Sequence, residues 1–130
     1  MVKILIVDDS RTSRKILRRI LEDNGFTIIG EAVNGEEGYL KYQELKPDLV
    51  TLDITMPKMD GLEALRLIKK FDENAKAVMI TAAGQKEKML LAIKSGAADF
   101  IAKPYEGSDV IKVIEKCAER HNRNEKDEIV

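Results

Sequence analysis

The sequence predicts an α/β protein built as a doubly wound five-stranded parallel sheet with five helices. Short apolar segments of the type that buried parallel strands require recur along the 130 residues, and a helical segment follows each of them. Polar side chains end four of these apolar segments. In an open parallel sheet, ligands bind at the edge where the strands have their carboxyl ends.

The first strand is expected at residues 4–7, a fully apolar run. A helix follows, which Ser10 or Asp9 can cap and which Asn24-Gly25 ends. Apolar residues at helical spacing form its expected stripe: Ile16, Leu17, Ile20 and Leu21.

Residues 27–32 are the expected second strand. Asn34-Gly35 turns the chain into a helix that ends before Pro47, because a residue that precedes proline disfavours helical backbone. The residues of this helix that we expect to face the core are Leu40 and Leu45.

The third strand is expected at residues 49–53, and the helix after it at residues 61–71. Apolar residues lie on one side of this helix: Leu62, Leu65, Ile68 and Phe71. Residues 77–81 predict the fourth strand, and a helix from Lys86 to Ser95 is ended by Gly96.

A short fifth strand is expected at residues 99–102, and Ser108 is the expected cap of the final helix. The apolar stripe of that helix consists of Ile111, Ile114 and Ala118. We expect one domain over residues 1–121 and a frayed polar tail over residues 122–130.

Composition excludes several classes of protein. The net charge of −1 gives no general affinity for nucleic acid or for anionic membranes. No apolar stretch reaches transmembrane length, and no signal peptide precedes the first strand, so we expect a cytoplasmic protein. Cys117 is the single cysteine, and its spacing from Val113 and Ile114 predicts a small buried residue rather than a reactive thiol.

Polar residues at the strand ends form the candidate site. Asp8 and Asp9 follow the first strand, Asp53 ends the third, Thr81 ends the fourth, and Lys103 follows the fifth. In a parallel sheet these residues converge at one edge. Three carboxylates, a hydroxyl and an ammonium suit a divalent metal ion and a phosphoryl group carried on a carboxylate.

Five motifs together resemble the receiver domain of bacterial two-component response regulators, over residues 3 to about 118. They are Val7-Asp8-Asp9, Leu52-Asp53, Met56-Pro57-Lys58-Met59-Asp60-Gly61, Thr81-Ala82 and Lys103-Pro104. The resemblance implies a flavodoxin-like, CheY-like fold with strand order 2-1-3-4-5. Within the family, Glu31-Ala32-Val33-Asn34-Gly35 is most similar to single-domain chemotaxis regulators of the CheY type. Lone receivers of sporulation phosphorelays are also similar, so a phosphate shuttle stays open as an alternative.

The resemblance implies that Asp53 accepts the phosphoryl group and becomes an aspartyl phosphate. It also implies a magnesium ion, bound by Asp9 and Asp53, by Asp8 with the help of water, and by the backbone carbonyl of Thr55. A hard cation would relieve the mutual repulsion of the three carboxylates.

Four further roles follow from the same resemblance. Lys103 pairs with Asp53 or with the phosphoryl oxygens, and the Lys103–Pro104 peptide is expected to be cis. Thr81 donates its hydroxyl to the phosphoryl group and moves when Asp53 is phosphorylated, and the space it leaves admits the ring of Phe100.

The expected partners are a histidine kinase or a histidine phosphotransfer protein, and a downstream target such as the flagellar switch. The phosphodonor is expected to dock on the first helix, whose basic residues are Arg11, Arg14, Lys15, Arg18 and Arg19. The target is expected on a face that presents Lys86, Lys88, Leu91, Lys94, Phe100 and Tyr105. We expect a monomer that binds neither nucleic acid nor membrane.

Three other classes are less consistent with the sequence. A phosphatase of the haloacid dehalogenase type requires a second aspartate two residues after the nucleophile, where this chain has Thr55. A nucleotide-binding domain requires a Gly-rich loop, and Asp8-Asp9-Ser10 follows the first strand instead. A receiver that serves only as a scaffold would not need an intact set of acids with Thr81 and Lys103. We therefore expect a signalling protein that catalyses only its own phosphotransfer and dephosphorylation.

Overall fold

Strands and helices alternate along the chain in this computed structural model, which describes the backbone of residues 1–129 and the side chains of residues 1–118. In chain order the elements are β1 (Lys3–Val7), α1 (Arg11–Asp23), β2 (Thr27–Ala32), α2 (Gly35–Leu45), β3 (Leu49–Asp53), α3 (Gly61–Phe71), β4 (Ala77–Thr81), α4 (Lys86–Lys94), β5 (Asp99–Ala102) and α5 (Gly107–Ile129). No helix in the described part of the chain is both long and apolar enough to cross a membrane.

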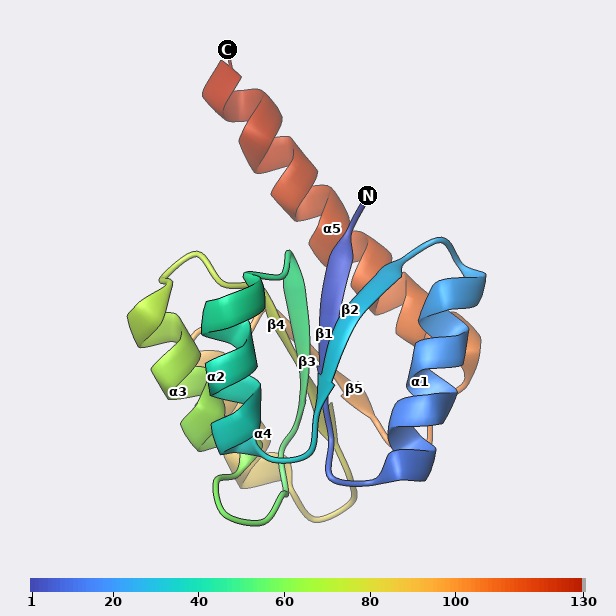
Figure 1. Ribbon diagram of the computed structural model, residues 1–130, viewed down its shortest axis with the longest axis vertical. Coiled ribbons are helices and arrows are strands. Elements are labelled where there is room, and N and C mark those ends of the chain that lie inside the picture. The colour runs from blue at the N-terminus through green and yellow to red at the C-terminus, as the bar shows by residue number, and fades with distance from the viewer. Residues whose placement is uncertain (130) are drawn as a thin grey trace.

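The strands form one parallel sheet in the order β2-β1-β3-β4-β5, which confirms the predicted fold class (Figure 1). Helices α1 and α5 cover one face of this sheet, and α2, α3 and α4 cover the other. This three-layer arrangement buries both faces of the sheet, which explains why its strands are almost continuously apolar.

The core consists of two apolar clusters, one on each side of the sheet. Alternate residues of β1 serve opposite clusters: Leu5 and Val7 pack toward α2 and α3, whereas Ile4 and Ile6 pack toward α1 and α5. Cys117 is buried in the second cluster, as its helical spacing predicted.

Three apolar residues that the sequence placed in helix stripes are exposed instead: Ile16, Leu40 and Phe71. Leu40 is 56% exposed because α2 turns Gly38 and Tyr42 toward the core, and residue 40 lies nearly half a turn away from them. Phe71 ends α3 and meets the ring of Tyr42 edge-on, with ring centroids 6.4 Å apart. Gly38 and Tyr42 therefore form the inner face of α2 that the sequence had predicted for Leu40.

Capping confirms most of the predicted helix starts. Ser10 caps α1 by accepting from the Ser13 N–H, and Asn34 caps α2 by accepting from the Glu37 N–H. The prediction for the last helix was wrong, because α5 begins at Gly107 and Ser108 lies inside its first turn. There Asp109 accepts a hydrogen bond of 3.1 Å from the backbone N–H of Glu106.

Helix α4 ends at Lys94, one residue before the predicted end. The backbone of α5 is helical through Ile129, so it continues into the segment 122–130 that we expected to be frayed. The side chains from residue 119 onward lie outside the described residues. The boundary between domain and tail at residues 121 and 122 stays a prediction.

Candidate functional site

The candidate site forms at the carboxyl edge of the sheet because the parallel strands end level with one another. Val7 pairs with Leu52, Asp53 pairs with Ile80, and Thr81 pairs with Ala102. The residues at these ends and directly after them therefore share one edge, as the sequence predicted.

The carboxylates of Asp8, Asp9 and Asp53 form an acidic cluster in which one oxygen of each lies within 4.8 Å of the others. Asp8 is only 4% exposed, and its Oδ1 accepts a hydrogen bond of 2.8 Å from the Ser10 N–H. Asp53 is half-buried, and its Oδ1 accepts a hydrogen bond of 3.2 Å from the Thr55 N–H.

Burial raises the pKa of Asp8, and the negative charges of Asp53 and Asp9 raise it further. The hydrogen bond from Ser10 and the positive charge of Lys103 lower that pKa, but they do not outweigh these effects. A cluster of oxygen ligands under this repulsion fits a hard divalent cation such as Mg²⁺. Asp8, Asp9 and Asp53 are the residues that could hold one. The participation of the Thr55 carbonyl stays a prediction.

Lys103 supplies the positive charge at the same edge. Its Nζ lies 3.1 Å from Asp53 Oδ2 and 3.5 Å from Asp8 Oδ2. Burial would lower the pKa of Lys103, but the hydrogen bond and charge of Asp53, together with Asp8, outweigh it and leave that pKa raised. The ammonium is therefore charged where a phosphoryl group on Asp53 would lie. The Lys103–Pro104 peptide is cis, as the resemblance implied.

Thr81 lies buried at the end of β4, and its carbonyl accepts a hydrogen bond of 2.6 Å from the Lys103 N–H. Phe100 is 38% exposed on β5, where it pairs with Met79. Thr81 therefore lies at the same edge as Asp53, and its role as a switch with Phe100 stays a prediction.

Two glycines fix the loop between β3 and α3 beside Asp53. A Cβ on Gly61 would lie 2.1 Å from the Asp53 carbonyl oxygen, and a Cβ on Gly35 would lie 2.4 Å from the Met59 carbonyl oxygen. The N–H groups of Gly61 and Gly35 donate to the carbonyls of Ile54 and Met59, each at 2.8 Å. Only residues without a side chain allow these close approaches.

Sequence reasoning missed two side chains that support the site. Arg14 Nη1 donates to the Asp8 carbonyl at 2.8 Å, while its Nε donates to Glu31 at 3.0 Å. Gln85 accepts from the Ala82 N–H at 2.6 Å and donates to the Thr55 hydroxyl. Arg14 and Glu31 are 17 positions apart in the chain, and Gln85 and Thr55 are 30 positions apart. Local sequence patterns do not indicate contacts over such separations.

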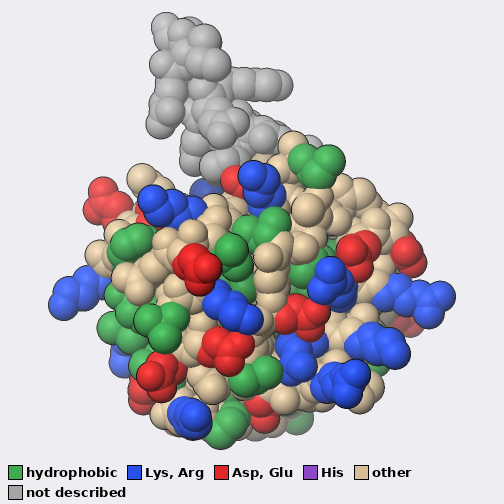
Figure 2. All heavy atoms as spheres, viewed as in Figure 1, with side chains coloured by type: hydrophobic (Ala, Val, Ile, Leu, Met, Phe, Trp, Pro, Cys, Tyr) green, Lys and Arg blue, Asp and Glu red, His purple; other side chains and the backbone are tan. Residues whose placement is uncertain are grey.

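Part of the basic surface predicted on α1 is neutralised. Arg14 and Arg18 both pair with Glu31, at 3.0 and 2.7 Å, whereas Arg11, Lys15 and Arg19 are exposed. Figure 2 shows basic side chains gathered on the side of the molecule where Figure 1 draws α1. Docking of a phosphodonor on this helix stays a prediction.

The predicted target face is open to solvent over most of its residues. Lys86, Lys88, Leu91, Lys94 and Phe100 are exposed. Tyr105 is half-buried, and burial raises the pKa of its hydroxyl. Its use by a partner stays a prediction.

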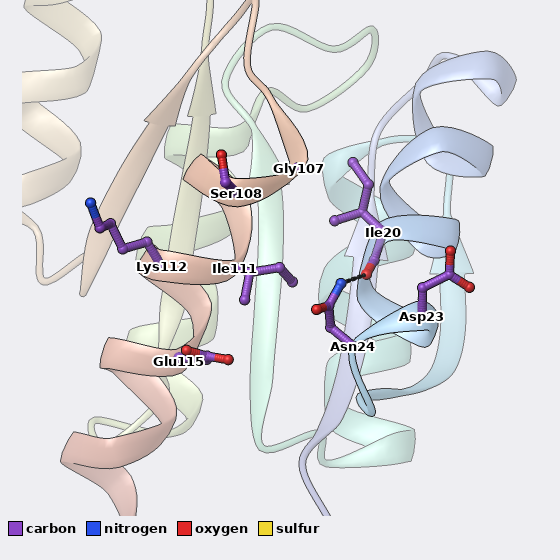
Figure 3. A pocket seen from close by; sticks show the side chains of 8 residues that line it. All are labelled: Ile20, Asp23, Asn24, Gly107, Ser108, Ile111, Lys112 and Glu115. Carbon is purple, nitrogen blue, oxygen red and sulfur yellow. Dashed lines mark hydrogen bonds between the residues drawn. The ribbon is translucent and has the colours of Figure 1, made fainter.

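Among the residues whose side chains the structure describes, two hollows lie outside the acidic cluster. One, of about 560 Å³, lies between the end of α1 and the first turns of α5, and Ile20 and Ile111 point into it (Figure 3). The other, of about 500 Å³, is lined by Thr55 and by residues 84–88. Of these two hollows, only the second is lined by residues of the loops that follow β3 and β4, among them Thr55.

Comparisons with known proteins agree with this geometry. The family model for the response regulator receiver domain matches residues 4–115. The chemotaxis protein CheY of Listeria monocytogenes is 50% identical over 118 residues, covering 91% of this chain and 99% of that protein. The CheY of Thermotoga maritima is 47% identical, covering 89% and 97%. Among solved structures, the CheX–CheY–BeF3–Mg complex from Borrelia burgdorferi matches with a TM-score of 0.85 and 42% identity, covering 88% of this chain and 87% of that chain.

Proposed function

Because the chain belongs to the response regulator receiver domain family, we propose that it is a single-domain regulator of chemotaxis switched by phosphorylation of Asp53. One observation carries the proposal: the Asp53 carboxylate lies 3.1 Å from the ammonium of Lys103 and clusters with the carboxylates of Asp8 and Asp9 at the carboxyl edge of the sheet. The similarity to proteins named CheY along nearly their whole length supports chemotaxis as the process.

In the proposed reaction, a carboxylate oxygen of Asp53 attacks the phosphorus of a phosphohistidine on a histidine kinase or a histidine phosphotransfer protein. The new O–P bond forms as the N–P bond breaks, and the histidine leaves with the electron pair of that bond. Lys103 balances the charge of the phosphoryl oxygens, and Thr81 donates its hydroxyl to one of them. A magnesium ion held by Asp8, Asp9 and Asp53 would add positive charge beside the same oxygens.

Hydrolysis ends the signal. Water attacks the phosphorus, the O–P bond to Asp53 breaks, and inorganic phosphate leaves while Asp53 returns to its carboxylate form. The protein therefore catalyses only its own phosphorylation cycle and converts no metabolite. It works in the cytoplasm, where kinase and target are both accessible.

Phosphorylation is proposed to draw Thr81 toward the phosphoryl group and to let Phe100 turn inward, which changes the surface formed by α4, β5 and α5. A target such as the flagellar switch would bind there, over Lys86, Leu91, Lys94 and Tyr105. Phe100 is 38% exposed, so an inward turn of its ring would bury further apolar surface, which supports this proposal.

The test is to incubate the protein with acetyl phosphate and Mg²⁺, and to locate the adduct by intact mass and peptide mapping. We expect a single phosphoryl group on Asp53 that is lost on treatment with base, and no labelling after a chelator has removed Mg²⁺. Asp53→Asn should remain unlabelled at low donor concentration. Labelling of another residue in that variant would contradict the assignment, and folded wild-type protein without any adduct would indicate a scaffold that is not phosphorylated.

A further inference from the structure

We propose that Gln85 is a positioning residue that clamps the β3–α3 loop to the β4–α4 loop beside Asp53 and slows hydrolysis of the aspartyl phosphate. This inference rests on the proposed function. Both polar atoms of the Gln85 side chain are engaged: Oε1 accepts from the Ala82 N–H at 2.6 Å, and Nε2 donates to Thr55 Oγ1. The amide therefore joins two loops that are far apart in the sequence.

The clamp ends next to the reacting groups on both sides. Thr55 lies two residues after Asp53, and its backbone N–H donates to Asp53 Oδ1 at 3.2 Å. Ala82 directly follows Thr81 at the end of β4. A change in the Gln85 side chain therefore reaches the Asp53 carboxylate through Thr55, and it reaches Thr81 through the single peptide bond between Thr81 and Ala82.

The start of α4 also indicates that the Gln85 side chain stabilises the loops rather than the helix. Ser10, Asn34 and Asp60 cap α1, α2 and α3 with side-chain hydrogen bonds, as N-cap residues usually do. Gln85 occupies the N-cap position of α4 and makes no such bond. Its side-chain amide bonds to Ala82 and Thr55 instead, so glutamine at this position joins the two loops and does not cap the helix.

The clamp lies where water must enter. Hydrolysis requires water in line with the O–P bond, on the side of the phosphorus away from Asp53, which at this edge is the solvent side. Thr55, Ala82 and Ala83 are exposed there, and the hollow of about 500 Å³ lined by Thr55 and residues 84–88 opens beside them. Because Gln85 holds the two loops together, its loss frees them and widens the path for water.

The experiment compares wild-type protein with Gln85→Ala, Thr55→Val and the double variant. Each is phosphorylated with acetyl phosphate and Mg²⁺ and freed of donor, and the decay of the phosphoprotein is followed by intact mass. We expect Thr55→Val, which removes the bond to Gln85, to lose phosphate roughly three- to tenfold faster than wild type, the effect of losing one hydrogen bond. Gln85→Ala also removes the bond from the Ala82 N–H and should lose phosphate at least as fast. The double variant should be no faster than Gln85→Ala, because Thr55→Val removes a contact that Gln85→Ala has already removed.

Gln43→Ala is the matched control, because Gln43 also donates one side-chain hydrogen bond, to Tyr39 at 3.2 Å, but lies on α2 outside the site. Its phosphoprotein should decay at the wild-type rate. A decay rate of Gln85→Ala within twofold of wild type, or multiplying effects in the double variant, would overturn the proposal.

A second measurement needs no phosphate. Amide hydrogen exchange at Ala82 should be roughly fivefold faster in unphosphorylated Gln85→Ala than in wild type, because its N–H loses its acceptor. Unchanged exchange would contradict the clamp itself. If wild-type protein accepts no phosphate, the proposed function and the effect on hydrolysis both fail, while exchange at Ala82 still decides whether Gln85 holds the loops.

Discussion

The ammonium of Lys103 lies 3.1 Å from Asp53 Oδ2, although the two residues are 50 positions apart in the chain. The same nitrogen lies 3.5 Å from Asp8 Oδ2, so one lysine faces two of the three acids of the cluster. Its raised pKa keeps it charged beside them. The positive charge that a phosphoryl group would need is therefore in place in the folded protein.

Replacement of Lys103 by alanine should slow phosphorylation of Asp53 by acetyl phosphate by about 100-fold, because a preorganised charge near the reacting oxygens is lost. Phosphoprotein formation over time, measured by intact mass, gives the rate. Lys112→Ala removes an exposed lysine on α5 and should react like wild type. Equal rates for Lys103→Ala and wild type would show that this contact does not assist the transfer.

Magnesium should stabilise the protein, because an ion that binds only the folded state adds about 2.7 kcal/mol at a hundredfold excess over its dissociation constant. Thermal unfolding with MgCl2 and with a chelator measures the effect as a rise in Tm. Asp9→Asn removes one acid of the cluster and should lose most of the rise, whereas Asp23→Asn, at the end of α1, should keep it. A rise of the same size in Asp9→Asn would place the ion elsewhere.

Substitution of Gly61 by alanine should destabilise the fold by about 2 kcal/mol, because the new Cβ would lie 2.1 Å from the Asp53 carbonyl oxygen and push β3 and α3 apart. The free energy of unfolding in urea gives the size. Gly107→Ala is the control, since its Cβ would meet Ile20 at an ordinary 3.7 Å. A Gly61→Ala protein as stable as Gly107→Ala would mean that the β3–α3 loop can move aside without cost.

Glu31 should contribute to stability at neutral pH and lose that contribution in acid. Burial would raise the pKa of Glu31, but hydrogen bonds from Arg18 and Arg14 outweigh it and leave that pKa below the ordinary 4.5. A lowered folded-state pKa means that the contribution is present above 4.5 and disappears as the pH falls through the folded value.

The measurement is urea unfolding of wild type and Glu31→Gln at about pH 7 and about pH 3. Wild type should be more stable by roughly 1 kcal/mol at the higher pH, and the gap should close at the lower one. Glu22→Gln breaks only the exposed pair with Arg18 and should change stability less. A gap that does not depend on pH would rule out an electrostatic origin.

Much of the fold could be predicted because the spacing of apolar residues and the positions of turn-forming residues are local properties of the chain. All five predicted strands lie within one residue of their observed bounds, Ser10 is one of the two caps expected for α1, and α2 begins at the predicted Asn34-Gly35 turn. Apart from the cap predicted at Ser108 and the end of α4, the mistakes concern which side of a helix faces inward. Leu40 was placed in the core by its type, but Gly38 and Tyr42 occupy the contact with β1 and α3, and a second bulky residue has no space there.

The sequence by itself determined the alternation of strands and helices in one parallel sheet and the edge at which Asp8, Asp53, Thr81 and Lys103 meet. It could do so because parallel strands in register carry their end residues to one edge whatever the side chains between them. Only the tertiary structure decided which partners these residues have. The bridge from Gln85 to Thr55, and the contact of Arg14 with both Glu31 and the Asp8 carbonyl, depend on side-chain conformations and on the packing of loops that no local pattern records.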